Sequence, residues 1–138
     1  MIVVDASAAL LALLEDGEAR VRLSDESLAA PHLIDSEIVQ ALRTQVRRGE
    51  IDARQALRAL ETWAKLGIQR VGVVGMLQRV WQLRDNLTAY DASYVAVAEA
   101  LDCELVTADR RLAGAPGTRC PITTVSTQTS TPRRATRS

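Results

Sequence analysis

The sequence is poor in cysteine, histidine and aromatic residues, and it contains no phenylalanine. Its 138 residues include two cysteines, one histidine, two tryptophans and two tyrosines. Two cysteines do not make a disulfide framework, and a single histidine gives no cluster of the kind that a zinc site needs. We interpret Cys103 and Cys120 as small core residues, and His32 as a helix-start or surface residue.

The chain also lacks an excess of charge and a long apolar run. Seventeen basic and seventeen acidic residues give a formal net charge of zero, and 47% of the residues are apolar, as in ordinary globular domains. No apolar stretch approaches the roughly 20 residues that span a bilayer. Because Asp5 directly precedes the apolar residues 6–14, we interpret that segment as a buried helix and not as a signal peptide, and we expect a cytoplasmic protein.

The last thirteen residues differ in composition from the rest. Residues 126–138 are rich in Ser and Thr, with three arginines and no acidic residue, and we expect a disordered tail there. Residues 1–125 have the length of a single domain. Without the tail's three arginines, 14 basic and 17 acidic residues remain, a net charge of −3. Binding of a polyanion would therefore need local arginines or bound cations.

Short β-branched runs alternate with helical segments along residues 1–125. The expected strands are residues 2–4, 28–30, 68–74, 104–107 and 122–125, and the expected helices are residues 8–14, 18–24, 32–48, 52–66, 76–83 and 88–101. Ser7 and Asp52 are the expected N-caps of the helices that follow them. Strands that alternate with helices predict a three-layer α/β fold around a mainly parallel sheet.

Four acidic residues stand where a hydrophobic core would not place them. Asp5 and Asp109 follow buried strands at their carboxyl ends, where open α/β sheets form their sites. Glu37 lies on the apolar face of its helix, and Asp91 begins an otherwise apolar run. Each one alone also has an ordinary explanation as a loop, capping or ion-paired residue.

Carboxylates that converge from four segments would repel one another unless a cation compensates them. Mg²⁺ and Mn²⁺ prefer carboxylate oxygens and need neither cysteine nor histidine. Such ions activate water and stabilise charge on a phosphoryl group. A metal-dependent phosphoesterase is therefore the hypothesis that these residues favour.

With these four acids in their positions, the sequence resembles the PIN-domain family, and most closely its VapC-type toxin ribonucleases. The resemblance covers residues 1–125 and rests on four motifs in order: MIVVDAS (1–7), DSEIVQAL (35–42), TAYDASY (88–94) continuing to AEAL (98–101), and LVTADRRL (105–112). It implies a PIN-like α/β ribonuclease domain that binds Mg²⁺ or Mn²⁺ and hydrolyses RNA. The acidic quartet that it implies as catalytic and metal-binding is Asp5, Glu37, Asp91 and Asp109.

The resemblance also implies roles for residues around the quartet. Asp5 and Asp91 would be the most direct ligands, while the hydroxyls of Ser7 and Thr107 would orient the site. Family members are typically toxins that a small VapB-type antitoxin inhibits, and they tend to form homodimers. Apolar surface for these partners is expected on residues 33–46 and 56–66, with Trp63 and Trp81 as candidate contacts.

Arginine is the expected contact to RNA, because 16 of the 17 basic residues are Arg and guanidinium groups suit phosphates. The candidates are Arg43 and Arg47 on the helix of Glu37, and Arg110 and Arg111 beside Asp109. An ordinary role on solvated helix faces remains open for them. With so few aromatic residues, recognition through the backbone and shape of the RNA is expected more than base stacking.

Two other functions remain open. A strand that ends in Asp also begins the haloacid-dehalogenase phosphatases, in which that Asp is a nucleophile, but they have a second Asp two residues later and this chain has Ser7. A non-catalytic PIN-like module that binds RNA or an antitoxin is the other alternative.

Overall fold

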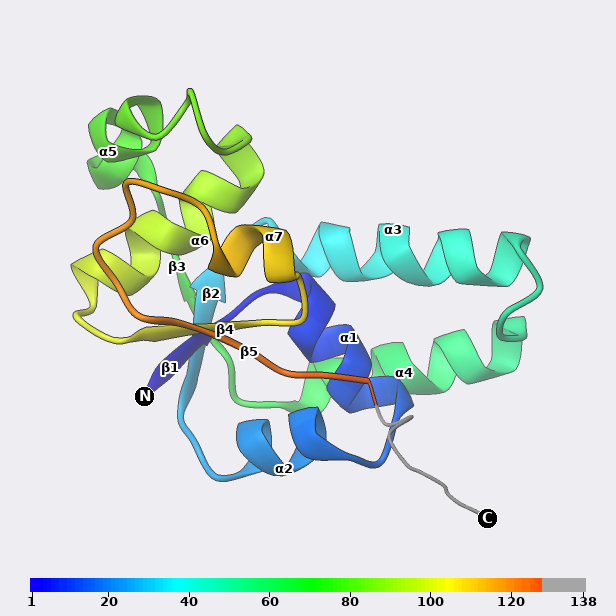
Figure 1. The fold of residues 1–138 in the computed structure, drawn as a ribbon. Helices are drawn as coiled ribbons and strands as arrows, with labels where there is room; N and C mark the ends of the chain where they lie inside the picture. The colour runs from blue at the N-terminus through cyan, green and yellow to red at the C-terminus, as the bar shows by residue number, and fades with distance from the viewer. Residues whose placement is uncertain (128–138) are drawn as a thin grey trace, which may run out of the picture.

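The structure is a computed structural model that describes residues 1–127 (Figure 1). Five parallel strands form one sheet in the order β3-β2-β1-β4-β5. The strands are β1 (Ile2–Val4), β2 (Leu28–Pro31), β3 (Gln69–Val71), β4 (Glu104–Thr107) and β5 (Ile122–Thr124). The expected tail lies outside the described residues, except for Ser126 and Thr127, which are exposed and have no regular secondary structure.

Helices cover the sheet and connect its strands. They are α1 (Ala6–Leu14), α2 (Glu18–Ser24), α3 (Ile34–Arg47), α4 (Ala53–Lys65), the 3₁₀ turn η1 (Val74–Met76), α5 (Leu77–Gln82), α6 (Ala89–Ala100) and α7 (Arg110–Ala113). Helix α6 packs on β1, β2 and β4, and α1 packs on β4 and on α2, α3 and α4. The sequence prediction of an α/β fold around a parallel sheet is confirmed.

The chain starts in the middle of the sheet, and this order decides where a site can form. From β1 the chain moves outward to β2 and β3, and then returns across the sheet to β4 and β5. The connections therefore leave β1 and β4 in opposite directions, and a crevice opens at the carboxyl ends of these two neighbouring strands. Asp5 follows β1 and Asp109 follows β4.

The core consists of β-branched strand residues and a helix that is apolar on all sides. Val3 and Val4 are fully buried in β1, as are Leu105 and Val106 in β4. In α6 every side chain from 92 to 98 is buried, which is why its sequence shows no polar face. A polar group on this helix can therefore lie only at its ends or against another buried partner.

Helices α3 and α4 form a hairpin that extends away from the sheet (Figure 1). The predicted cap at Asp52 is present as a capping box, in which Asp52 accepts from the Gln55 N–H and its own N–H donates to the Gln55 side chain. At the base of the hairpin, Asp35 accepts hydrogen bonds from the Trp63 indole and, through both carboxylate oxygens, from Arg70. These bonds tie α3, α4 and β3 together.

Three local predictions are wrong. Asp5, not Ser7, is the N-cap of α1, because its carboxylate accepts from the Ala8 N–H. Strand β3 ends at Val71 instead of residue 74, since Gly72 follows and glycine weakens strand pairing. A short helix, α7, follows β4, where none was predicted. Within residues 1–127, each helix is too short or too polar to cross a membrane.

Candidate active site

Asp5 is a buried carboxylate with hydrogen bonds to both of its oxygens. Its side chain is 6% exposed at the junction of β1 and α1. Oδ1 accepts from the Ser7 hydroxyl at 2.7 Å and from the Ala8 N–H at 3.0 Å, while Oδ2 accepts from the Thr107 hydroxyl. Three donors, two from the first turn of α1 and one from the end of β4, therefore fix the position of this carboxylate.

The hydroxyls of Ser7 and Thr107 link the ends of β1 and β4. The Ser7 oxygen accepts from the Ala108 N–H at 2.9 Å, and the Thr107 oxygen accepts from the Asp109 N–H at 3.0 Å. Thr107 is fully buried. Both residues predicted to orient the site thus contact Asp5, and through Thr107 the position of Asp5 is coupled to that of Asp109.

Glu37 lies in the first turn of α3 and reaches across to α6. Its Oε1 accepts a hydrogen bond of 2.5 Å from the Tyr94 hydroxyl. Tyr94 is 1% exposed and was not predicted as a site residue. Its spacing of three residues from Asp91 places the two on one face of the helix, which is the signal that sequence reasoning did not use.

Asp91 and Asp109 each lie at the start of a helix. Asp91 is in the first turn of α6, and its N–H donates to the capping hydroxyl of Thr88. Asp109 caps α7 and accepts from the Arg111 N–H. The exposed Arg111 guanidinium lies 3.1 Å from Asp109 and 3.9 Å from Asp91, so it joins these two carboxylates.

The carboxylates lie close enough together to alter one another's protonation. Burial raises the pKa of Asp5, and the charge of Asp91 raises it further, against the effect of the three hydrogen bonds. Burial and the charges of Asp91 and Asp5 likewise raise the pKa of Glu37. Burial and Asp109 raise the pKa of Asp91, and Arg111 partly offsets this rise. All four predicted acids therefore belong to one electrostatic group.

This group has the donor chemistry of a site for a hard divalent cation. The donors are carboxylate oxygens, and the repulsion that raises their pKa values is what a cation relieves. In the part of the chain that the structure describes, no three Asp, Glu, His or Cys side chains are gathered closely enough to hold an ion as they stand. Binding would therefore require other carboxylates to rotate towards the held ones, above all that of Asp91, whose contact is the 3.9 Å ion pair with the exposed Arg111.

A hollow of about 350 Å³ adjoins Asp91. It is lined by the basic residues Arg84 and Arg111, by the acids Asp85 and Asp91, and by neutral residues of α7 and of the segment before α6. Arg84, which stacks on Trp81 with its guanidinium 4.5 Å from the ring centre, was not predicted. The hollow thus brings two guanidinium groups next to the acidic group, and such groups suit the phosphates of a phosphodiester.

The other predicted arginines lie in different surroundings. Arg110 is exposed in α7, next to the acidic group. Arg43 and Arg47 are exposed on α3, six and ten residues beyond Glu37, or roughly 9 and 15 Å along the helix. The structure therefore brings Arg111 to the carboxylates but leaves Arg43 and Arg47 on the projecting hairpin.

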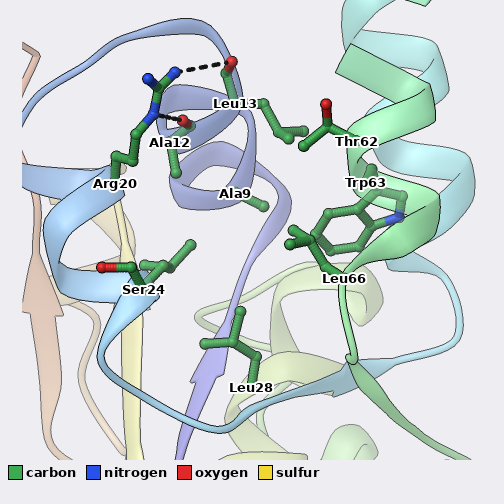
Figure 2. Close-up of a pocket in the computed structure, with 10 residues that line it drawn as sticks. Ala9, Ala12, Leu13, Arg20, Ser24, Leu28, Thr62, Trp63 and Leu66 are labelled. Carbon is green, nitrogen blue, oxygen red and sulfur yellow. Dashed lines mark hydrogen bonds between the residues drawn. The ribbon is translucent and has the colours of Figure 1, made fainter. Parts of the chain in front are cut away.

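A second, apolar hollow of about 370 Å³ lies between α1, α2 and α4 (Figure 2). Figure 2 shows the Trp63 ring and Leu66 facing Ala9 and Leu28 across it, while Arg20 hydrogen-bonds the carbonyls at the end of α1. None of the four acids lines this hollow. Trp63 is only 4% exposed, whereas Trp81 is 65% exposed.

Comparisons with known proteins give consistent matches. Residues 2–117 match the family model described as PIN domain. Ribonuclease VapC9 of Mycobacterium tuberculosis is 56% identical over 125 residues, which cover 91% of this chain and 98% of that protein. Ribonuclease VapC1 of the same organism is 45% identical, with 87% and 94% covered.

Two solved structures are similar. The PAE2754 protein from Pyrobaculum aerophilum superposes with a TM-score of 0.66 at 31% identity, over 88% of this chain and 81% of that one. VapC20 of Mycobacterium tuberculosis, described as a toxin that cleaves the sarcin–ricin loop, gives a TM-score of 0.59 at 18% identity, over 86% and 99%. At that identity the second likeness concerns the fold alone.

Proposed function

Because this chain belongs to the PIN-domain family, we propose that it is a VapC-type toxin: an endoribonuclease that hydrolyses RNA phosphodiester bonds with the help of Mg²⁺ or Mn²⁺. The observation that supports this proposal best is the electrostatic coupling of Asp5, Glu37 and Asp91, with Asp109 acting on Asp91. These residues lie at the starts of four different helices, α1, α3, α6 and α7, and two of them follow the neighbouring strands β1 and β4. Capping residues with separate structural roles would have no reason to converge in this way.

The carboxylates of Asp5, Glu37, Asp91 and Asp109 would hold the cation. When bound, it supplies an activated water and stabilises the negative charge that develops on the phosphoryl group. The hydroxyls of Ser7 and Thr107 keep Asp5 in place through the bonds described above. A nucleophilic role for Asp5, as in haloacid-dehalogenase phosphatases, fits poorly because the position of their second Asp is occupied by Ser7, whose hydroxyl donates to Asp5.

Arginines beside the acidic group would bind the phosphates of the RNA. Arg111 and Arg84 line the hollow next to Asp91, and Arg110 is exposed nearby. Arg43 and Arg47 would contact more distant phosphates. A guanidinium group makes two parallel hydrogen bonds to a phosphate, so this arrangement would orient the scissile bond towards the carboxylates.

We also propose a VapB-type antitoxin and a second copy of the chain as protein partners. Val39 on α3 and Leu57 on α4 are exposed apolar residues of the projecting hairpin, and Trp81 is exposed on α5. Exposed apolar side chains of this kind are typical of contact surfaces. Because Trp63 is buried, its contribution would come through the apolar hollow that it lines.

The test is cleavage of a mixed pool of cellular RNA by the purified protein, with Mg²⁺ or Mn²⁺ and with EDTA. The Asp5→Asn variant is run alongside. Asp16→Asn, which makes the same chemical change at an exposed position outside the acidic group, is the matched control. We expect discrete fragments from wild type and Asp16→Asn, and none with EDTA or from Asp5→Asn.

Two outcomes would contradict the proposal. Cleavage by Asp5→Asn at the wild-type rate would mean that these acids are not the catalytic group. No cleavage by folded protein that is free of any antitoxin, with either cation, would favour the non-catalytic RNA- or antitoxin-binding module.

A further inference from the structure

One partly buried hydrogen bond beside the acidic group joins α6 to α3. The hydroxyl of Tyr94 donates to Oε1 of Glu37 at 2.5 Å, and 57 residues separate the two in the sequence. Tyr94 is 1% exposed. A buried tyrosine hydroxyl needs a partner, and here the partner is a carboxylate of the proposed cation site.

The carboxylates differ in how firmly they are held. Asp5 accepts from three donors, two in the first turn of α1 and one at the end of β4. Within residues 1–127 the structure gives Glu37 one donor, the Tyr94 hydroxyl. A glutamate side chain has one more rotatable bond than an aspartate, so a single bond to a rigid partner decides much of its orientation.

Tyr94 is a rigid partner because of where it lies. It is flanked in α6 by side chains that are all buried, and it lies one turn after Asp91. Its hydroxyl therefore holds Glu37 at a fixed distance from the helix that also provides Asp91. Because Asp91 lies one turn before Tyr94 on the same face of α6, the bond from Tyr94 keeps the Glu37 carboxylate beside the helix face that provides Asp91.

We propose that Tyr94 is a positioning residue, whose hydroxyl keeps the Glu37 carboxylate facing Asp5 and Asp91 so that the acidic group can bind its divalent cation. This inference rests on the proposed function, because it concerns the same site. Tyr94 acts only through Glu37 and touches neither the RNA nor the reacting atoms. Residues that orient metal ligands typically change metal affinity by 10- to 100-fold when they are mutated.

The test is Mn²⁺ binding to the metal-free protein, measured by titration calorimetry, together with RNA cleavage over a range of Mn²⁺ concentrations. Tyr94→Phe removes the hydroxyl and keeps the buried ring. We expect it to weaken Mn²⁺ binding by roughly 10- to 100-fold and to lower cleavage at limiting Mn²⁺, with recovery at saturating Mn²⁺. Tyr90→Phe is the matched control, because it removes the same atom from a 64% exposed residue of the same helix.

A double-mutant cycle separates positioning from packing. If Tyr94 acts through Glu37, then Glu37→Gln and the double variant Glu37→Gln/Tyr94→Phe should bind Mn²⁺ equally, within about twofold. A residue that only supports the fold would instead give additive effects, together with a lower melting temperature.

A second measurement does not depend on whether Tyr94→Phe folds. The chain has two tyrosines, so in Tyr90→Phe the ¹³Cζ resonance of a labelled tyrosine reports on Tyr94 alone. We expect this resonance to shift when Mg²⁺ is added. An unchanged resonance, wild-type Mn²⁺ affinity in Tyr94→Phe, or additivity in the cycle would each overturn the positioning role. Wild-type protein that neither binds Mn²⁺ nor cleaves RNA would instead overturn the proposed function itself.

Discussion

At the scale of single residues, Asp5 has a capping role and a site role at once. Its Oδ1 caps α1 and also accepts from Ser7, while its Oδ2 accepts from Thr107 at the end of the neighbouring strand. Either role alone would explain an aspartate at this position. Together, the hydrogen bonds of the two roles compensate for the loss of water around this carboxylate, which is only 6% exposed.

Asp91 provides the residue-scale prediction. Burial and repulsion from Asp109 both disfavour the charged form of its carboxylate and raise its pKa. The contact to Arg111, at 3.9 Å, offsets this rise only in part. We expect Asp91→Asn to abolish RNA cleavage and to raise the free energy of unfolding of the metal-free protein by about 0.5–2 kcal/mol, because the neutral amide removes both penalties. Urea unfolding in EDTA, run with a cleavage assay, measures both effects.

Asp16→Asn serves again as the control, since it removes a charge outside the acidic group. It should change neither cleavage nor stability measurably. An Asp91→Asn protein that is as active as wild type, or clearly less stable, would show that Asp91 is not a repelled member of this group.

The identities of the four acids could be predicted from the sequence, but their partners could not. Asp5 and Asp109 each follow an apolar strand, and this position alone indicates a site at the carboxyl ends of the strands, without any knowledge of the fold. The contact between Tyr94 and Glu37 spans two helices, and sequence periodicity describes one helix at a time. Serine favours the N-cap position, which is why the sequence predicts Ser7 there, yet Asp5 is the cap and the helix begins two residues earlier.

At the scale of elements, strong periodicity gave reliable predictions and short segments did not. The predicted helix at 52–66 is α4, with Asp52 as its cap, and that at 32–48 is α3. In contrast, α7 has four residues, too few to show a helical period. Strand β3 has three residues and exposed or half-buried side chains, so its ends depend on pairing with β2 and not on local propensity.

The ion pair between Arg79 of α5 and Glu99 of α6 provides a prediction at this scale. Arg79 binds both carboxylate oxygens, the Arg119 N–H donates to one of them, and the side chains are 18% and 12% exposed. Burial opposes ionisation, but these hydrogen bonds outweigh it and hold the pKa of Glu99 below its ordinary value. The pair therefore stabilises the packing of α5 on α6 when Glu99 is charged.

The sign of the pH dependence follows from that direction. Because the folded pKa of Glu99 lies below the unfolded value of about 4.3, its contribution is complete above that value and is lost as the pH falls through the folded pKa. We expect Glu99→Gln to lower the free energy of unfolding at pH 7 by about 1–3 kcal/mol. The difference from wild type should shrink between pH 5 and pH 3.

Urea unfolding at pH 7, 5 and 3 measures this difference. Glu61→Gln, on the exposed face of α4, is the matched control and should follow wild type at every pH. A difference that is constant with pH would mean that the shape of the side chain, and not its charge, explains the effect of Glu99→Gln.

At the scale of the whole molecule, the acidic group exists only in the folded chain. Asp5 and Asp109 come from strand ends that lie about a hundred residues apart in the sequence, while Glu37 and Asp91 come from helices on other connections. The unfolded chain has no such cluster. A cation that binds the four carboxylates therefore binds the folded state alone, and its binding free energy adds to the stability of the fold.

This coupling gives the last prediction. At a Mn²⁺ concentration 100 times the dissociation constant, binding should add about 2.7 kcal/mol to the free energy of unfolding, which for a domain of this size raises the melting temperature by roughly 5–15 °C. Thermal unfolding in EDTA and in Mn²⁺ measures the shift. Asp16→Asn should retain it and Asp5→Asn should lose most of it. An equal shift in Asp5→Asn would place the ion elsewhere on the protein, and no shift at millimolar Mn²⁺ would mean that the four carboxylates do not form a cation site.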